Sequence, residues 1–101
     1  MTTDQQTDRK EELLQAILSL KTTEEASAFL RDLLTEPEIE EFAGRFSVAQ
    51  ALFSGKSQRT VSKETGVSIA TVTRVNQWLV RGMNGYKTVI ERLNQHHHHK
   101  N

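Results

Sequence analysis

The chain has 101 residues, 36% of them hydrophobic, with a formal net charge of zero and no cysteine. This length suits one domain with a modest core, which would gain from sharing apolar surface with a second copy. The absence of cysteine excludes disulfides and thiol chemistry, and it favours a cytoplasmic protein. No apolar run approaches the roughly 20 residues that cross a bilayer, and the polar, acidic start is unlike a signal peptide, so we expect no membrane partner.

The charges divide unevenly along the chain. Residues 1–41 carry eleven acidic and four basic side chains, whereas residues 42–101 carry nine basic and two acidic ones. Such a division is typical of a protein that meets a polyanion at one end. Two ordinary solvated faces would give the same division, so the charge alone leaves both interpretations open.

The first half of the chain predicts three helices. Residues 1–8 lack apolar periodicity and are expected to be disordered, and a domain over residues 9–94 follows, starting with a helix over residues 9–20. Two pairs of residues carry the signature of a capping box at a helix start: Thr22 with Glu25, and Thr35 with Glu38. The third helix should run to about Ser54 and end at Gly55.

The apolar residues of these helices recur at the spacing of one helical face, and we expect them to pack in the core. In the first two helices they are Leu13, Leu14, Ile17, Leu18, Leu20, Ala26, Phe29, Leu30, Leu33 and Leu34. In the third helix they are Phe42, Phe46, Ala49, Leu52 and Phe53. None of the three helices carries a catalytic pattern.

The end of the chain predicts one more helix and a tail. Glycines at 82 and 85 interrupt the pattern, and a short last helix is predicted from Tyr86, Val89, Ile90 and Leu93. Residues 95–101 are expected to form a flexible tail that contains four adjacent histidines. Whether that run is native or a purification tag, it forms no defined site, and we assign no metal.

A twenty-residue pattern that begins at Gln58 predicts a helix-turn-helix over residues 57–77. The positions that must be small, apolar or glycine hold suitable residues: Val61, Ser62, Gly66, Val67, Val72 and Val75. Ser57 and Ser68 stand where the two helices need N-caps, and only Thr65 fits its position poorly. An ordinary helical corner with a glycine turn is the alternative interpretation.

The outward side of the second helix has the chemistry of a DNA-reading surface. The residues expected there are Ser68, Ile69, Ala70, Thr71, Thr73, Arg74 and Gln77. Small and hydroxyl-bearing side chains can approach base edges and thymine methyl groups in the major groove. The basic residues expected to contact phosphates, opposed only by Glu64, are Lys56, Arg59, Lys63, Arg74 and Arg81, although Lys56 and Arg81 also suit a plain surface role.

From about Leu34 to Leu79 the sequence resembles the Trp repressor family, and within it the YerC/YecD-type branch. The resemblance is carried by LTEPEIEEFAGRF, SQR and IATVTR. It implies an all-α, intertwined homodimer that binds a palindromic operator as a transcriptional regulator. The family's DNA contacts fall on Gln58, Arg59, Ile69, Ala70, Thr71 and Thr73. Its lysine contact falls on Ser62, with Lys63 one place later.

The resemblance also implies a corepressor pocket, in which tryptophan lies between two arginines that match Arg45 and Arg74, with Thr35 near the entrance. Two other pocket positions differ from the family, because Val75 replaces a glycine and Trp78 replaces a serine. The added bulk should clash with an indole, so we expect that L-tryptophan is not the corepressor and leave any effector unassigned. Trp78 either fills part of the vacated site or belongs to the dimer interface.

The sequence argues against an enzyme and predicts no cofactor. Every histidine lies in the tail, the acidic residues lack a partner for acid–base or nucleophilic work, and no glycine-rich phosphate loop is present. We therefore predict a sequence-specific DNA-binding regulator, most simply a repressor, with double-stranded DNA and a second copy as its partners. The alternatives are a helix-turn-helix used for protein contact, a helper subunit with weak non-specific DNA binding, and a relative of transposase or sigma-factor DNA readers.

Overall fold

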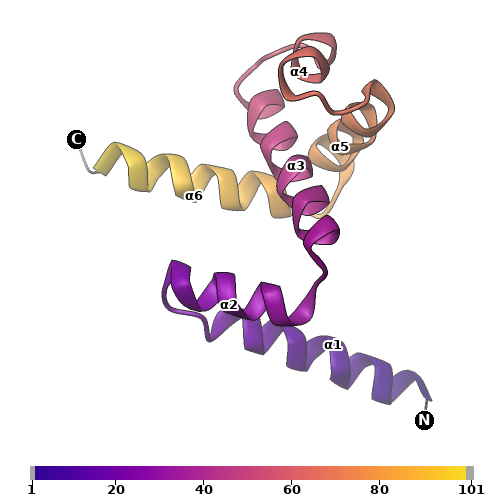
Figure 1. The fold of residues 1–101 in the computed structure, drawn as a ribbon, viewed down its shortest axis with the longest axis vertical. Helices are drawn as coiled ribbons and strands as arrows, with labels where there is room; N and C mark the ends of the chain where they lie inside the picture. Colours follow the sequence, from indigo (N-terminus) through magenta and orange to yellow (C-terminus); the bar gives the residue numbers. More distant parts are fainter. Residues whose placement is uncertain (1, 100–101) are drawn as a thin grey trace. The chain divides into compact units, whose positions relative to one another are not determined.

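A computed structural model of the chain describes residues 2–99, with side chains described from residue 8 to residue 95. Its described residues form six helices and no strand (Figure 1). The helices are α1 (Thr2–Leu18), α2 (Thr23–Leu33), α3 (Glu36–Phe53), α4 (Gln58–Thr65), α5 (Ile69–Arg81) and α6 (Gly85–His99). The chain divides into two compact units, Met1–Ile39 and Glu40–Asn101. Within the described range, no helix is both long and apolar enough to cross a membrane.

The ends of the chain are more helical than the sequence predicts. Helix α1 begins at Thr2 rather than near residue 9, and α6 continues to His99 instead of giving way to a flexible tail at residue 95. Residues 2–8 and 95–99 are polar, so apolar periodicity gives no signal for them, although the glutamines among them favour a helix. Met1, Lys100 and Asn101 lie outside the described residues.

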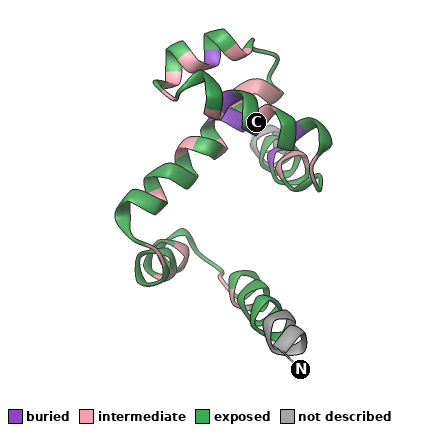
Figure 2. Ribbon diagram, turned by 90° about the vertical axis from the view of Figure 1, so that its right-hand side faces the viewer, coloured by how far each residue is buried: buried purple, intermediate pink, exposed green. Residues whose placement is uncertain are grey.

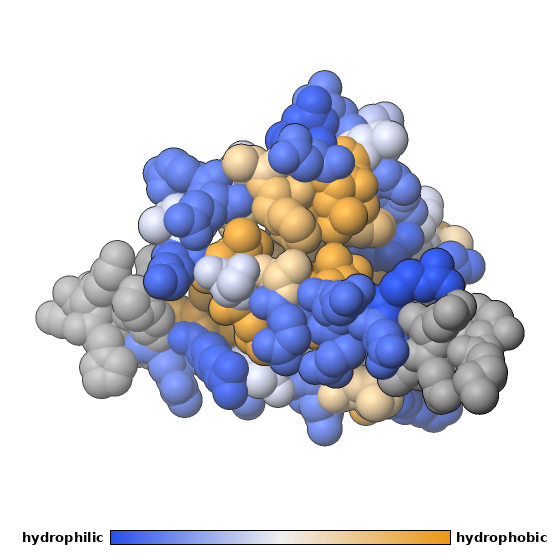
Figure 3. Space-filling view, turned by 90° about the horizontal axis from the view of Figure 1, so that it is seen from below, coloured by the Kyte–Doolittle hydropathy of each residue, from blue (hydrophilic) through white to orange (hydrophobic). Residues whose placement is uncertain are grey.

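The apolar side chains of the first unit are not buried between residues 8 and 39, where side chains are described. No residue from 8 to 39 is buried, and several large side chains are exposed: Leu13, Leu14, Ile17, Leu18, Leu30 and Leu33. The prediction that these residues pack in a core is therefore wrong for the single chain. Two amphipathic helices offer too little surface to cover both apolar faces. Hydrophobic residues, orange in Figure 3, lie on the surface of the molecule in that view.

The second unit holds the core. Its fully buried side chains come from four helices and form one cluster: Val48, Ala49, Val61, Val72, Val75 and Ile90. All buried residues, purple in Figure 2, belong to α3, α4, α5 and α6. Helix α5 contacts both α4 and α6. On α3, Phe42 was expected inside but is exposed, because the core side of α3 centres on Val48 and Ala49.

Both ends of α3 have the capping bonds that the sequence predicts. At its start, the Thr35 amide donates to the Glu38 carboxylate (2.9 Å) and the Glu38 amide donates to the Thr35 hydroxyl (3.3 Å). At its end, Gly55 takes a positive φ of 107°, and the amides of Gly55 and Lys56 donate to the carbonyls of Leu52 and Ala51. This is the Schellman arrangement, in which the chain turns sharply toward α4.

Candidate nucleic-acid interface

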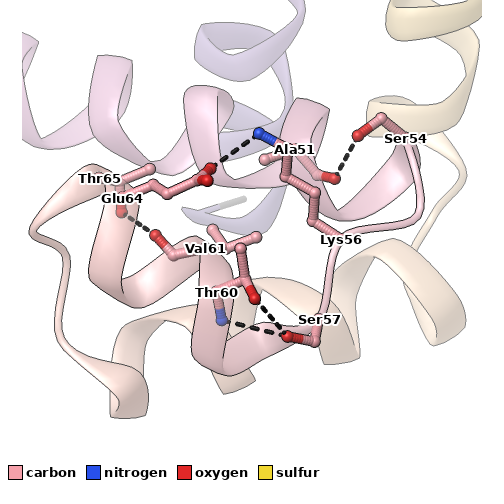
Figure 4. Close-up of polar contacts among 8 residues, drawn as sticks. All are labelled: Ala51, Ser54, Lys56, Ser57, Thr60, Val61, Glu64 and Thr65. Atoms are coloured by element: carbon pink, nitrogen blue, oxygen red, sulfur yellow. Dashed lines mark hydrogen bonds and ion pairs between the residues drawn. The ribbon is translucent and has the colours of Figure 1, made fainter.

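Helix α4 begins and ends on the residues that the pattern assigns to it. Ser57 is the N-cap, and its hydroxyl accepts a hydrogen bond from the Thr60 amide at 3.1 Å (Figure 4). Gly66 ends the helix in the left-handed region with φ 76°, and its amide donates to the Ser62 carbonyl. Glycine adopts this conformation without the Cβ clash that other residues meet.

The turn at residues 66–68 is held by side chains as well as by backbone. The Ser62 hydroxyl donates to the Val67 carbonyl at 2.7 Å. The Thr65 hydroxyl donates to the Val61 carbonyl at 2.7 Å and accepts from the Val67 amide at 3.2 Å. These bonds explain why Thr65 serves where an apolar residue is common, because its hydroxyl pairs turn groups that would otherwise lose hydrogen bonds. Ser62 is likewise occupied within the turn.

Helix α5 starts at an N-cap that also orders its first turn. The Ser68 hydroxyl accepts from the Thr71 amide at 3.2 Å and donates to the Thr71 hydroxyl at 3.1 Å. The helix then buries one side, because Val72, Val75 and Leu79 lie in the interior. Since α5 is anchored by its cap and by its valines, its opposite side is held in a defined orientation toward solvent.

The outward residues of α5 lie where the sequence places them, with one difference. Six of them are exposed: Ser68, Ile69, Ala70, Thr73, Arg74 and Gln77. Thr71 is half-buried, because its side chain bonds to Ser68 and lines a small cavity. The exposed start of α5 is therefore small and uncharged, with an arginine following one turn later.

The basic side chains around this surface differ in how they are engaged. Lys56 forms an ion pair with Glu64 at 2.7 Å, the side chains reaching toward each other in Figure 4. Arg59, Lys63 and Arg74 are exposed. No acidic residue occurs between Glu64 and Glu91 in the sequence. Glu64, the acidic residue nearest to this surface in the sequence, is thus already paired with Lys56. The α4–α5 surface carries the positive charges of the exposed arginines and lysine.

One side-chain hydrogen bond joins the two helices at this surface. The Thr73 hydroxyl donates to the amide oxygen of Gln58 at 2.8 Å, although the residues are 15 positions apart. Gln58 is the first residue of α4 and is half-buried, whereas Thr73 is exposed on α5. Both belong to the residues that the family resemblance marks as DNA contacts, and the structure brings them together.

The residues of the predicted effector pocket are also brought together, with one exception. A cavity of about 150 Å³ is lined by Glu41, Arg45, Thr71, Arg74, Val75, Trp78 and Tyr86. Four of the five predicted pocket residues are among them, while Thr35 belongs to the first unit. Glu41 and Tyr86 were not predicted. The spacing of Glu41 four residues before Arg45 is a signal that could have identified the first, whereas nothing local marks Tyr86.

Within this cavity Arg45 already has partners from its own helix. Its guanidinium pairs with the Glu41 carboxylate at 2.7 Å and lies 5.4 Å from the centroid of the Phe42 ring. The Val75 side chain belongs to the buried core rather than standing free in the cavity. Trp78 lines the cavity but is 59% exposed.

Trp78 also borders a larger apolar groove. This groove has a volume of about 560 Å³ and is lined by Phe46, Trp78, Gly82, Met83, Gly85, Tyr86 and Val89. Met83 is 95% exposed, and the ring of Phe46 stacks near that of Tyr86 with centroids 6.5 Å apart. Trp78 thus borders both the arginine cavity and the apolar groove while it remains mostly exposed in the single chain.

Helices α3 to α6 define a small all-helical protein that presents two short, tightly joined helices beside an arginine-lined cavity. The sequence model of the family described as Trp repressor protein matches residues 8–94 of this chain. The chain therefore belongs to the Trp repressor family, which confirms the family identified from the sequence motifs.

Individual relatives agree with this assignment. The chain is 38% identical over 85 residues to a Bacillus subtilis protein named uncharacterized protein YerC, covering 84% of this chain and 82% of the relative. It is 33% identical over 85 residues to the Trp operon repressor homolog of Chlamydia caviae, and the match covers 83% of this chain and 84% of that relative. The crystal structure of a TrpR like protein from Eubacterium eligens matches with a TM-score of 0.79 and 44% identity, over 83% of this chain and 87% of that one.

Proposed function

We propose that the chain is a sequence-specific DNA-binding transcriptional repressor in which α4 and α5 form a helix-turn-helix and α5 enters the major groove. The observation that carries the proposal is the start of α5, where Ser68, Ile69 and Ala70 are exposed while Val72 and Val75 anchor the opposite side. Reading helices of this kind contact base edges with their N-terminal residues. The name of the Chlamydia caviae relative, a Trp operon repressor homolog, agrees with this role.

The chemistry of the α5 start suits direct readout of bases. Ile69 and Ala70 are short enough to let the helix approach, and they offer apolar contact to thymine methyl groups. The Thr71 hydroxyl accepts a hydrogen bond from Ser68 and keeps its own O–H donor, which can bond base edges directly or through water. Because Ser68 also caps the helix, its backbone position is fixed before DNA arrives.

The exposed cations have a different role in this proposal. Arg59, Lys63 and Arg74 surround the reading surface and are suited to phosphates, which fix the position of the protein without reading the sequence. Neutralising phosphates releases counterions, so the affinity should fall steeply with added salt. Lys56 is left out of this set because it pairs with Glu64 in the free chain.

The apolar surface of the single chain favours a homodimer. The first unit buries no residue from 8 to 39, and the second unit leaves an apolar groove of about 560 Å³ beside Trp78 and Met83. Exposed apolar surface of this extent is typical of a chain that folds against a partner. Two copies would present two α5 helices to successive major grooves, which requires a palindromic operator.

The cavity between Arg45 and Arg74 supports a repressor that acts without L-tryptophan. Its volume of about 150 Å³ is below the roughly 300–1,000 Å³ of ordinary ligand pockets. Glu41 already supplies Arg45 with a carboxylate, the group that an amino acid ligand would bring. Val75 and Trp78 add side chains where the family has a glycine and a serine, and enlarging the site would disturb the buried core that includes Val75.

The proposal is tested by selecting bound sites from random duplexes and then titrating the selected duplex by fluorescence anisotropy at several salt concentrations. We expect an inverted repeat to be enriched. Thr71→Ala should lower affinity for that site by roughly 5- to 150-fold, the range for losing one base contact. Thr88→Ala, an exposed threonine on α6, is the matched control and should bind as wild type does. Equal binding of selected and scrambled duplexes would contradict the proposal and favour a helper subunit.

A further inference from the structure

The hydrogen bond between Thr73 and Gln58 has a defined donor and a defined acceptor on the proposed DNA surface. It is the one side-chain hydrogen bond between α4 and α5 among residues 8–95, whose side chains are described. The Thr73 hydroxyl is the donor and Oε1 of Gln58 is the acceptor, at 2.8 Å. The two helices that carry Gln58 and Thr73 are held against each other, because Val61 of α4 and Val72 of α5 both pack in the core.

The bond determines which atoms of Gln58 remain for another partner. A glutamine amide has one acceptor oxygen and one amino group with two N–H donors, held in a common plane. Because Oε1 of Gln58 accepts from Thr73, the amino group at Nε2 points away from Thr73 and keeps its N–H donors for another partner. DNA offers acceptors to such a donor, both at its phosphate oxygens and at purine N7 and O6 atoms in the major groove.

The same bond limits what Thr73 can do. A threonine hydroxyl has a single O–H donor, and here it is directed to Gln58. Phosphate oxygens only accept hydrogen bonds, so Thr73 cannot donate to a phosphate while it holds Gln58. Its position on the exposed side of α5 therefore serves the neighbouring glutamine on α4.

We propose that Thr73 is the positioning residue of Gln58, one of the DNA contacts that the family resemblance implies, rather than an independent DNA contact. This inference rests on the proposed DNA-binding function and refines it. A long, flexible side chain loses rotamer freedom when it binds, and the Thr73 bond restricts those rotamers before DNA arrives. Losing a single hydrogen bond of this kind corresponds to roughly a two- to twelvefold change in affinity.

A double-mutant cycle on the selected duplex tests the assignment. Thr73→Val keeps the shape and removes the hydroxyl, Thr73→Ser keeps the hydroxyl, and Gln58→Ala removes the amide. We expect Thr73→Val and Gln58→Ala each to weaken binding by roughly two- to twelvefold, with Thr73→Ser within twofold of wild type. In the Gln58→Ala background, adding Thr73→Val should cause no further loss. Thr88→Val on α6 controls for the substitution itself.

The other outcomes each overturn the assignment. Losses that add in the double variant would make Thr73 an independent contact. Affinity unchanged in Thr73→Val, with the fold verified by circular dichroism, would mean that the bond only packs α4 against α5. If the wild-type chain binds no duplex at all, the proposed function fails and this assignment fails with it. Additive losses leave the proposed function standing, so the two failures are distinguishable.

Discussion

Replacing Gly66 by alanine isolates the contribution of one backbone conformation to the turn between α4 and α5. Gly66 has φ 76°, and a Cβ added there would meet no atom within 4 Å. The cost therefore comes from the left-handed conformation alone, roughly 1–2 kcal/mol for a residue with a Cβ. The smaller backbone entropy of unfolded alanine returns about 0.4–1 kcal/mol. The expected net loss is roughly 1 kcal/mol.

The matched control is Gly85→Ala at the first residue of α6. Gly85 also has open space around its Cβ position, but it is not among the glycines with positive φ. Alanine there keeps the entropic gain without the conformational cost, so stability should rise by up to about 1 kcal/mol. Gly66→Asn should lose less than Gly66→Ala, because asparagine tolerates the left-handed region better.

Urea unfolding followed by circular dichroism measures these differences, with all variants at the same protein concentration because association would add to the apparent stability. In thermal unfolding of the same variants, a loss of 1 kcal/mol should lower the midpoint temperature by roughly 4–8 °C in a domain of this size. If Gly66→Ala is as stable as Gly85→Ala, the left-handed turn is not what the glycine provides.

Three further predictions concern the core, the α3 cap and the arginine cavity. Val72→Ala removes two fully buried methyl groups and should cost roughly 2–3 kcal/mol in urea unfolding, and a loss under about 0.5 kcal/mol would contradict the core assignment. Hydrogen bonds from the Thr35 amide and hydroxyl hold the pKa of Glu38 below its ordinary 4.5. The stabilisation that accompanies this lowered pKa is fully present above pH 4.5 and is lost as the pH falls through the pKa that Glu38 has in the folded chain. Glu38→Gln should therefore flatten the acid side of a plot of stability against pH, whereas Glu40→Gln should not. Calorimetric titration with L-tryptophan should show no saturable binding, and tight binding would overturn the account of the cavity.

Local chemistry explains which parts of the fold the sequence could predict. The caps at Ser57 and Ser68, the Thr35–Glu38 pair and the glycine turns at 55 and 66 were all predicted, and the structure has them. Each depends on residues within a few positions of one another. The arginine cavity was predicted from the family resemblance, whereas spacing alone would not bring Arg45 of α3 and Arg74 of α5 to one site.

What the sequence could not predict depends on contacts between distant segments or on their absence. Periodicity marks the apolar face of α1 and α2, but it does not say what covers that face, so Leu18 was expected inside and is 75% exposed. The Gln58–Thr73 bond depends on how α4 crosses α5, which no local pattern encodes. The start of α1 at Thr2 was not predicted either, because residues 2–8 are polar and apolar periodicity gives no signal there.

The most direct test of the central claim compares the affinity for the selected inverted repeat with the affinity for a scrambled duplex at physiological salt, with and without L-tryptophan. The account predicts a ratio of at least about 10³ in the absence of L-tryptophan, as for specific protein–DNA complexes, and no change when it is added. A ratio near one without L-tryptophan would contradict the account, whether or not the amino acid then restores specific binding.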